Sequence, residues 1–393
     1  MYKFIIVILL IIIFVELIFI GYNLINKNKK YIYFDGINAM EYNNNYYVAV
    51  GSNNDNDNHF EKAKISSYNK KKEKILENVY NVGYNSSFFG TLIDGDNVIA
   101  VGSYEKDKSD RKNSIRHALI VKYDLNGKIL FEKDFKLLDN SKFTNISKYG
   151  DYYYVTGQSV YKNNKIGTDS GGAILCKYDK DGKLIWSKSY GSNKSAIYNN
   201  LIICNDSLYV VGNDENYLGI ICRYDFDGNI IDYNDYKSTD NIGFSGIVNI
   251  EDKIYVSGAN RGGDSTDAMI VMYDSSCNYL SEVTYDNGGI DRFSKLVLDD
   301  DKNIIAIGTM YTTRTDSNES VDEYNYNGII GKYDSNLNMI DVVNYGDERD
   351  DYFTDIIFAN EKYLVSGYSS YEDGSYMSKF INYSKALKVL EVE

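Results

Sequence analysis

The chain has 393 residues, with 56 acidic and 42 basic side chains and a formal net charge of −14. A nucleic-acid-binding protein needs a basic face that neutralises phosphates, so this balance argues against DNA or RNA as a partner. The length is sufficient for one large domain with an apolar interior.

The first element in the chain is an apolar run at residues 4–20, which only Glu16 interrupts. The run is at the short end of the length that spans a bilayer and is long for the core of a signal peptide. Since no small-residue cleavage motif follows it, we expect residues 1–30 to form a transmembrane helix with a short linker, so that residues 4–20 contact the membrane. A signal peptide cleaved at an unrecognised site is the alternative.

The side of the membrane on which the remaining chain lies is less plainly encoded. Lys27, Lys29 and Lys30 follow the run and only Lys3 precedes it, which leans toward a cytoplasmic domain. A very short tail before an apolar run is, however, the usual form of an export signal. We therefore expect residues 31–393 to lie outside the cytoplasm, at the cell surface.

From residue 31 onward, a β-favouring tripeptide followed by glycine occurs seven times. The glycines are 46 to 59 residues apart, at Gly51, Gly102, Gly157, Gly212, Gly258, Gly308 and Gly367. An aromatic or apolar residue precedes each glycine by about 14 residues, at Ile37, Phe89, Phe143, Tyr198, Phe244, Phe293 and Phe353. A tyrosine ends the strand that follows each glycine, at Tyr68, Tyr123, Tyr178, Tyr224, Tyr273, Tyr333 and Tyr383. Such a long period in a β-rich sequence predicts blades or coils.

Each repeat is consistent with four strands, A to D, in which a tight turn joins C to D. The turns at 124–127, 179–182 and 225–228 end in glycine, which favours a hairpin. Later copies have Cys277, Leu337 and Leu387 there at the same spacing, which predicts the same hairpin with a different or more strained turn. Four antiparallel strands repeated seven times predict an all-β, seven-bladed β-propeller. A parallel β-helix needs shorter coils. The predicted blades are approximately 34–83, 84–137, 138–192, 193–238, 239–288, 289–348 and 349–393.

The repeat also resembles a known family. Its best copy has Gly172–Asp179, then Gly182 and Lys183, then Trp186, and finally Tyr190 and Gly191. This pattern is similar to the bacterial seven-bladed β-propeller repeat (SBBP-type repeat proteins). That resemblance implies a secreted or surface protein and no particular reaction. A weaker likeness to quinoprotein propellers rests on Trp186 alone.

No motif for catalysis or for a cofactor is present. His59 and His117 are the only histidines and have no metal-binding spacing, and no Gly-x-Ser-x-Gly elbow occurs. The four cysteines have no Cys-x-x-Cys spacing, although a disulfide is possible. Asp55 and Asp57 alternate with asparagines and could bind calcium, but the spacing of a calcium loop is incomplete. We expect no cofactor, with these two residues as weak candidates for calcium.

The connection between strands B and C is the part of the repeat whose length varies freely. Loops tolerate length changes and carry binding residues, so the face formed by the B–C and D–A connections is the predicted binding face. We expect the ligand-binding residues to be Arg261, Asp264, Asp291, Arg314, Asp322, Tyr324, Tyr326, Asp350 and Tyr371.

Three functions follow from these features. The first is a membrane-tethered, non-enzymatic binding scaffold, monomeric in its propeller, whose partner is a protein or a cell-wall or extracellular glycan. The alternative is an enzyme that acts on saccharides through paired carboxylates near the central channel, drawn from Asp291, Asp350 and Asp351. The third is a structural role in the assembly of a membrane complex.

Overall fold

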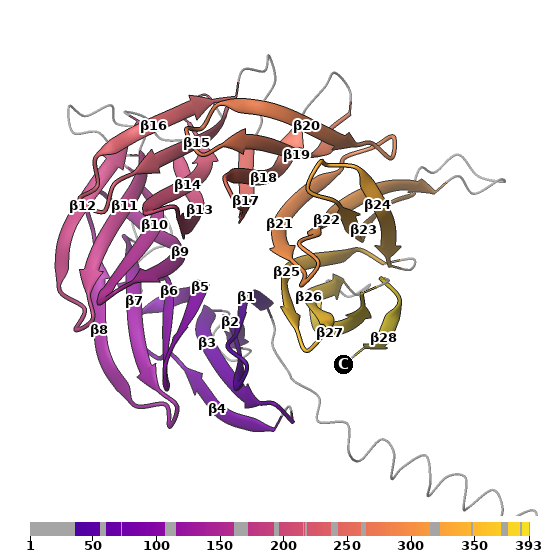
Figure 1. Ribbon diagram of the computed structural model, residues 1–393. Helices are drawn as coiled ribbons and strands as arrows, with labels where there is room; N and C mark the ends of the chain where they lie inside the picture. Colours follow the sequence, from indigo (N-terminus) through magenta and orange to yellow (C-terminus); the bar gives the residue numbers. More distant parts are fainter. Residues whose placement is uncertain are drawn as a thin grey trace, which may run out of the picture. The chain divides into compact units, whose positions relative to one another are not determined.

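A computed structural model describes most of the repeats. The described residues are 36–55, 60–71, 73–106, 115–160, 172–191, 196–214, 216, 218–236, 243–260, 265–314, 323–346, 349–370, 376–385 and 387–392. All of them belong to the unit Phe34–Val392. Every helix or strand in this part of the chain is a β-strand, and consecutive strands within each repeat pair antiparallel (Figure 1).

Six sheets contain these strands. The first consists of β1 (Gly36–Tyr42), β2 (Tyr46–Asp55), β3 (Phe60–Asn69) and β4 (Lys74–Val79). The second has eight strands: β5 (Tyr84–Asp94), β6 (Asn97–Glu105), β7 (Arg116–Asp124), β8 (Ile129–Phe135), β9 (Asn140–Tyr149), β10 (Tyr152–Val160), β11 (Gly172–Asp179) and β12 (Leu184–Tyr190).

The other four sheets have four strands each. The third contains β13 (Ile197–Cys204), β14 (Ser207–Asn213), β15 (Gly219–Tyr224) and β16 (Ile230–Asp235). The fourth contains β17 (Gly243–Ile250), β18 (Lys253–Asn260), β19 (Asp267–Asp274) and β20 (Tyr279–Tyr285). The fifth contains β21 (Arg292–Leu298), β22 (Ile304–Arg314), β23 (Glu323–Tyr333) and β24 (Met339–Tyr345), and the last contains β25 (Asp351–Ala359), β26 (Lys362–Ser370), β27 (Tyr376–Ser384) and β28 (Val389–Val392).

The predicted architecture of seven separate four-stranded blades behind a transmembrane helix is wrong in this form. The structure has five separate four-stranded blades and one sheet of eight strands, in which a single parallel pair, Arg116 with Asn140, joins β7 to β9. The spacing of the repeats records strand positions but not a hydrogen bond between adjacent sheets. No helix among the described residues is long and apolar enough to cross a membrane. Residues 4–20 lie outside the described residues.

The sheets follow one another around a common centre, as in a β-propeller (Figure 1). The first strand of each repeat lies innermost and the fourth lies outermost. Burial follows this order, because β6 and β7 are buried almost throughout whereas β8 is largely exposed. The core therefore lies between neighbouring sheets. The tyrosine that ends the third strand is buried in all seven repeats and packs in the core.

The repeated glycine is explained by a bulge in the innermost strand. In each repeat the glycine pairs with the aromatic or apolar residue of that strand, and the next residue bulges out, at Asn38, Phe89, Thr144, Asn199, Ser245, Ser294 and Thr354. A Cβ on any of these glycines would overlap a carbonyl oxygen of the bulged strand. The predicted residue Phe89 is therefore one position too late, since Phe88 is the residue that pairs with Gly102.

Several bulged side chains tie one innermost strand to the next. Asn38 donates to the carbonyl oxygen of Phe88 at 2.8 Å, and Thr144 donates to that of Tyr198 at 2.6 Å. Asn199 donates to the carbonyl oxygen of Phe244 at 2.7 Å. These bonds fix the spacing of the innermost strands, and with it the width of the central channel.

The turns without glycine are strained, as predicted. Cys277, Leu337 and Leu387 have φ values of 60°, 65° and 52°, in the left-handed region. Each keeps the hairpin hydrogen bond, and each side chain is buried in a hydrophobic cluster. Burial of the side chain offsets the cost of the backbone conformation. All four cysteines are free thiols, so the possible disulfide does not form.

The ring closes between the first and the last sheet through side chains. The backbone N–H of Met40 in β1 donates to Oδ2 of Asp355 in β25 at 2.6 Å. Nearby, Tyr42 donates to Asn360, and the amide of Asn360 donates to the hydroxyl of Tyr47. In the described residues, no strand from one end of the chain joins the sheet at the other end.

Candidate functional site

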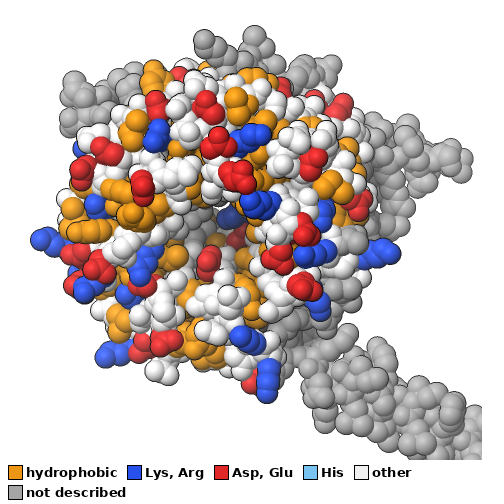
Figure 2. Space-filling model, viewed as in Figure 1, with side chains coloured by type: hydrophobic (Ala, Val, Ile, Leu, Met, Phe, Trp, Pro, Cys, Tyr) orange, Lys and Arg blue, Asp and Glu red, His pale blue; other side chains and the backbone are white. Residues whose placement is uncertain are grey.

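A cavity of about 360 Å³ lies in the central channel. Its walls come from six innermost strands: β1, β5, β9, β13, β21 and β25. Figure 2 shows a hollow at the centre of one face of the molecule, with acidic and basic side chains around it. The lining residues belong to the second half of most of these strands, so the cavity lies toward the turns that join the first and second strands.

Strand alternation divides the innermost strands into two sets of side chains. Met40, Ile146, Leu201, Leu296 and Ile356 are buried, the last four in the clusters between sheets. Their neighbours point to the other face of the sheet, because successive side chains of a strand alternate. Among these neighbours that line the cavity, one layer contains Ala39, Gly90, Asn145, Asn200, Lys295 and Asp355, and the layer nearer the turns contains Glu41, Leu92, Ser147, Val297 and Ile357.

Asp355 is the most constrained of the charged residues in the cavity. It is only 1% exposed. Its Oδ2 accepts from the N–H of Met40, and its Oδ1 accepts from its neighbour Ile356 at 2.9 Å. The Nζ of Lys295 lies 3.3 Å from the same Oδ1. Both carboxylate oxygens are therefore occupied, which indicates a structural role for Asp355 at the junction of β1, β21 and β25.

Glu41 differs from Asp355 in its exposure and in its hydrogen bonding. Its side chain is partly exposed to the cavity and makes no hydrogen bond or ion pair with the residues that the structure describes. Burial, together with the nearby charge of Asp355, raises the pKa of Glu41 to about 7, and Lys295 offsets only part of this effect. Glu41 is thus a carboxyl group with unused hydrogen-bonding capacity that changes its charge near neutral pH.

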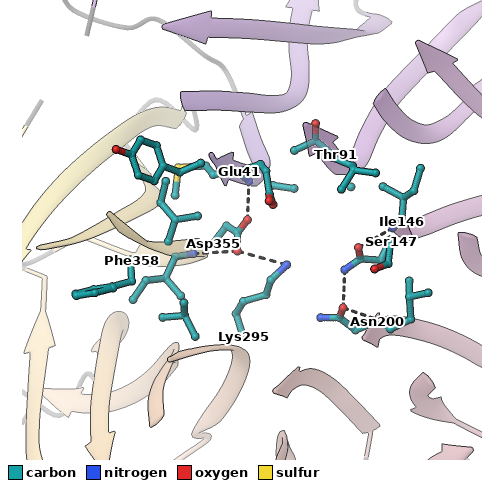
Figure 3. Close-up of a pocket in the computed structure, with 18 residues that line it drawn as sticks. Glu41, Thr91, Ile146, Ser147, Asn200, Lys295, Asp355 and Phe358 are labelled. Atoms are coloured by element: carbon teal, nitrogen blue, oxygen red, sulfur yellow. Dashed lines mark hydrogen bonds and ion pairs between the residues drawn. The ribbon is translucent and has the colours of Figure 1, made fainter. Parts of the chain in front are cut away.

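The opposite wall is polar, and most of its polar groups hydrogen-bond to one another or to the backbone (Figure 3). Asn145 donates to Oδ1 of Asn200 at 2.6 Å, and the amide of Asn200 donates to the carbonyl oxygen of Ser245 at 3.1 Å. The oxygens of the two asparagines also accept from the backbone of β9 and β13. Ser147 lines the same wall, and its hydroxyl has no hydrogen-bond partner among the described residues.

Most of the predicted ligand-binding residues lie where the structure gives no side chain. Arg261, Asp264, Asp322 and Tyr371 lie outside the described residues, as does the calcium candidate Asp57. Arg314 and Tyr324 are in the paired ends of β22 and β23, and Asp55 ends β2, but their side chains are not described. These assignments stay predictions. Within the described ranges, no group of three or more His, Cys, Asp or Glu residues has a metal-binding arrangement.

Three predicted residues have described side chains. Asp291 is fully buried and accepts from the N–H of Asn287 at 2.6 Å, in the connection between β20 and β21. Asp350 accepts at 3.0 Å from the N–H of Tyr326, so these two residues are brought together. The ring of Tyr326 lies between those of Tyr311 and Tyr352, at centroid distances of 4.9 and 5.3 Å.

The predicted carboxylates do not line the channel cavity. Asp291, Asp350 and Asp351 are absent from its walls, and Asp351 is 3% exposed and pairs with Lys379. The carboxyl groups that do line it, Glu41 and Asp355, were not predicted. A signal for Asp355 exists in the sequence, since Lys295 and Asp355 each stand two residues after the repeated aromatic residue, where other repeats have mainly small or amide residues.

No family model matches the chain, and no curated protein matches it in sequence. The resemblance to the bacterial seven-bladed repeat family therefore has no support from a family model. Solved structures do match. An ulvan lyase, of a polysaccharide lyase family named PL25, has 11% identity and a TM-score of 0.54, with 87% of this chain and 90% of that chain covered.

Two further structures are similar at the same level. The acylaminoacyl peptidase of Pyrococcus horikoshii has 11% identity and a TM-score of 0.53, with 92% of this chain and 52% of that chain covered. The WD40 β-propeller domain of Doa1 has 10% identity and a TM-score of 0.50, with 88% and 97% covered. Identities this low are informative about the fold alone. The chain is a β-propeller.

Proposed function

We propose that this β-propeller is a non-enzymatic binding protein whose ligand site is the cavity in the central channel. The observation that carries the proposal is the unpaired carboxyl group of Glu41 in a cavity of about 360 Å³. Ligand sites have this size and combine apolar walls with a few convergent polar groups. Here Leu92, Val297 and Ile357 supply apolar walls, and Glu41 and Ser147 supply unused polar groups.

The hydrogen bonds and the ion pair that Asp355 already makes favour a binding function over saccharide cleavage. Glycoside hydrolysis by paired carboxylates needs two carboxyl groups that reach the substrate. Among the described residues, Glu41 and Asp355 are the only carboxyl groups in the cavity walls. Asp355 is 1% exposed and its oxygens are held by two backbone N–H groups and by Lys295, so it is poorly placed to act as a nucleophile or base.

The face of the B–C and D–A connections is the proposed contact region for a larger partner, a protein or a glycan. What supports this part of the proposal is a row of half-buried aromatic side chains at that end of two neighbouring sheets, formed by Tyr311, Tyr326, Tyr352 and Tyr368. Aromatic rows of this kind offer contact area with little loss of conformational entropy.

Ligand-observed NMR on the full-length protein tests the channel site. The panel contains small amines, polyols, amino acids and monosaccharides. Two variants narrow the cavity from opposite walls, Ser147→Trp in β9 and Val297→Phe in β21. We expect some panel members to bind the wild type and to bind neither variant. During long incubation with the wild type, these compounds should remain chemically unchanged. Binding that survives in both folded variants would refute the channel site, and conversion of a ligand would refute the non-enzymatic assignment.

A further inference from the structure

We propose that the channel ligand is a small primary amine, whose ammonium group pairs with Glu41 and whose carbon chain packs on Leu92, Val297 and Ile357. This inference rests on the channel being a binding site, as proposed above. It adds the chemical class of the ligand and the group that selects it.

The charges in the cavity point to a cation. Lys295 and Asp355 form an ion pair, and Asp355 also accepts two backbone hydrogen bonds, so these two charges largely cancel. Of the lining residues that the structure describes, Glu41 is then the one with an uncompensated charge when it is ionised. An anionic ligand would be repelled by this carboxylate, and a neutral ligand would leave it unpaired. Only a cation supplies the missing partner.

The surroundings of Glu41 distinguish an amine from a metal ion. Calcium takes six to eight oxygen ligands, whereas both oxygens of Asp355 already accept hydrogen bonds and the asparagines of the opposite wall are hydrogen-bonded to each other and to the backbone. An ammonium group needs a single carboxylate as its charged partner. Its attached methylene groups fit the apolar side chains that share the layer of Glu41: Leu92, Val297 and Ile357.

Binding of a cation here is coupled to loss of a proton. Three titratable side chains of the lining surround Glu41: Asp355 from β25, Lys295 from β21 and Tyr42 from its own strand. The other lining strands, β5, β9 and β13, contribute none to the cavity. Because the pKa of Glu41 is raised to about 7, its ionised fraction increases about tenfold between pH 6 and pH 8. The ammonium group stays protonated over this range, so affinity increases with the ionised fraction.

The test compares n-butylamine with 1-butanol, which has the same chain without the charge. Affinities are measured by NMR titration of the full-length protein at pH 6, 7 and 8. Wild type is compared with Glu41→Gln, and with Glu251→Gln as a control, since Glu251 is an exposed acid that pairs with Lys302 at a surface turn. We expect the wild type to prefer the amine over 1-butanol by at least tenfold at pH 8 and to lose most of this preference at pH 6. The control variant Glu251→Gln should bind both compounds as the wild type does.

Each outcome decides the inference. Loss of the preference in Glu41→Gln with retained binding of 1-butanol supports it. Equal affinity of the wild type for both compounds, or an amine preference that persists in Glu41→Gln, overturns the amine assignment, and the channel site stands if Ser147→Trp still blocks binding. If neither compound binds the wild type, the amine assignment is wrong. If no member of the wider panel binds in the channel either, the proposed function is wrong as well.

Discussion

The backbone N–H of Met40 donates a hydrogen bond of 2.6 Å to the carboxylate of Asp355, which lies 315 residues later in the chain. This bond links the first innermost strand to the last one and so closes the ring of sheets. The same carboxylate holds Lys295 from the preceding sheet. One buried aspartate therefore joins three sheets beside the cavity.

Replacement of this aspartate should weaken the whole domain. Asp355→Asn removes the negative charge that Lys295 pairs with and weakens the bond to Met40. Breaking a buried ion pair costs about 3–5 kcal/mol, and the partial exposure of Lys295 reduces this to roughly 2–3 kcal/mol. Chemical denaturation measures the change. Asp301→Asn, which removes an exposed partner of Lys385, is the control and should cost less than about 1 kcal/mol. Equal losses in both variants would contradict the closing role of Asp355.

Stability should decrease as the pH rises from about 4.5 to about 7, because of Glu41, and should level off above 7. The pKa of this carboxyl is raised to about 7 in the folded protein from an ordinary value of 4.5, so the folded state binds more protons than the unfolded state between these values. The contribution to stability is full below about pH 4.5 and is lost as the pH increases through 7. Glu41→Gln stays neutral, so it should be more stable than the wild type at pH 8, by up to about 3 kcal/mol.

Thermal unfolding of wild type and Glu41→Gln across pH 5 to 8.5 measures this difference. The two melting temperatures should be similar at pH 5 and should separate as the pH increases. Parallel curves over the whole range would show that Glu41 titrates normally.

The repeated glycine should tolerate no side chain. A Cβ at Gly258 would overlap the carbonyl oxygen of Gly243, so Gly258→Ala should cost at least about 2 kcal/mol through displacement of the strand. Gly243→Ala is a matched control in the same sheet, because its Cβ would meet only Asn213 at an ordinary contact distance of 3.7 Å. Urea denaturation of both variants is the measurement. Similar stabilities would mean that the close approach of the strands is not what selects glycine.

The strained turn at Leu337 offers a test of the balance between strain and burial. Leu337→Gly relieves a left-handed backbone conformation, worth about 1 kcal/mol, but deletes a buried side chain, worth about 2–5 kcal/mol. The variant should therefore be less stable than the wild type by roughly 2 kcal/mol in urea denaturation. A gain in stability would mean that the backbone strain outweighs the packing of Leu337.

Much of the fold could be predicted from the sequence because packing fixes the repeat. The glycine, the aromatic residue opposite it and the tyrosine after it each fill a defined position, and loops absorb the differences in length. Two features could not be predicted. The pair of Arg116 with Asn140, which merges two repeats into one sheet, depends on a local approach of backbones that no residue type encodes. The bulge also obscured which of Phe88 and Phe89 faces Gly102.

The cavity was harder to predict because its residues come from six strands spread over more than 300 positions. Glu41 looks like any surface acid in the sequence, since its neighbours Asp355 and Lys295 are distant in the chain. The loops drew attention because their lengths vary, whereas the channel residues lie within strands whose spacing in the repeat is nearly constant. Alignment of the repeats on the aromatic residue would have placed Lys295 and Asp355 in one layer.

The most direct test of the channel site is the titration of Glu41 itself. Carbon-13 NMR of the glutamate carboxyl groups, with Glu41 assigned from the Glu41→Gln spectrum, gives its pKa with and without n-butylamine. We predict a pKa near 7 in the free protein and a lower value when the amine is bound. A carboxyl that titrates near its ordinary value, and does not respond to the amine, would contradict the account.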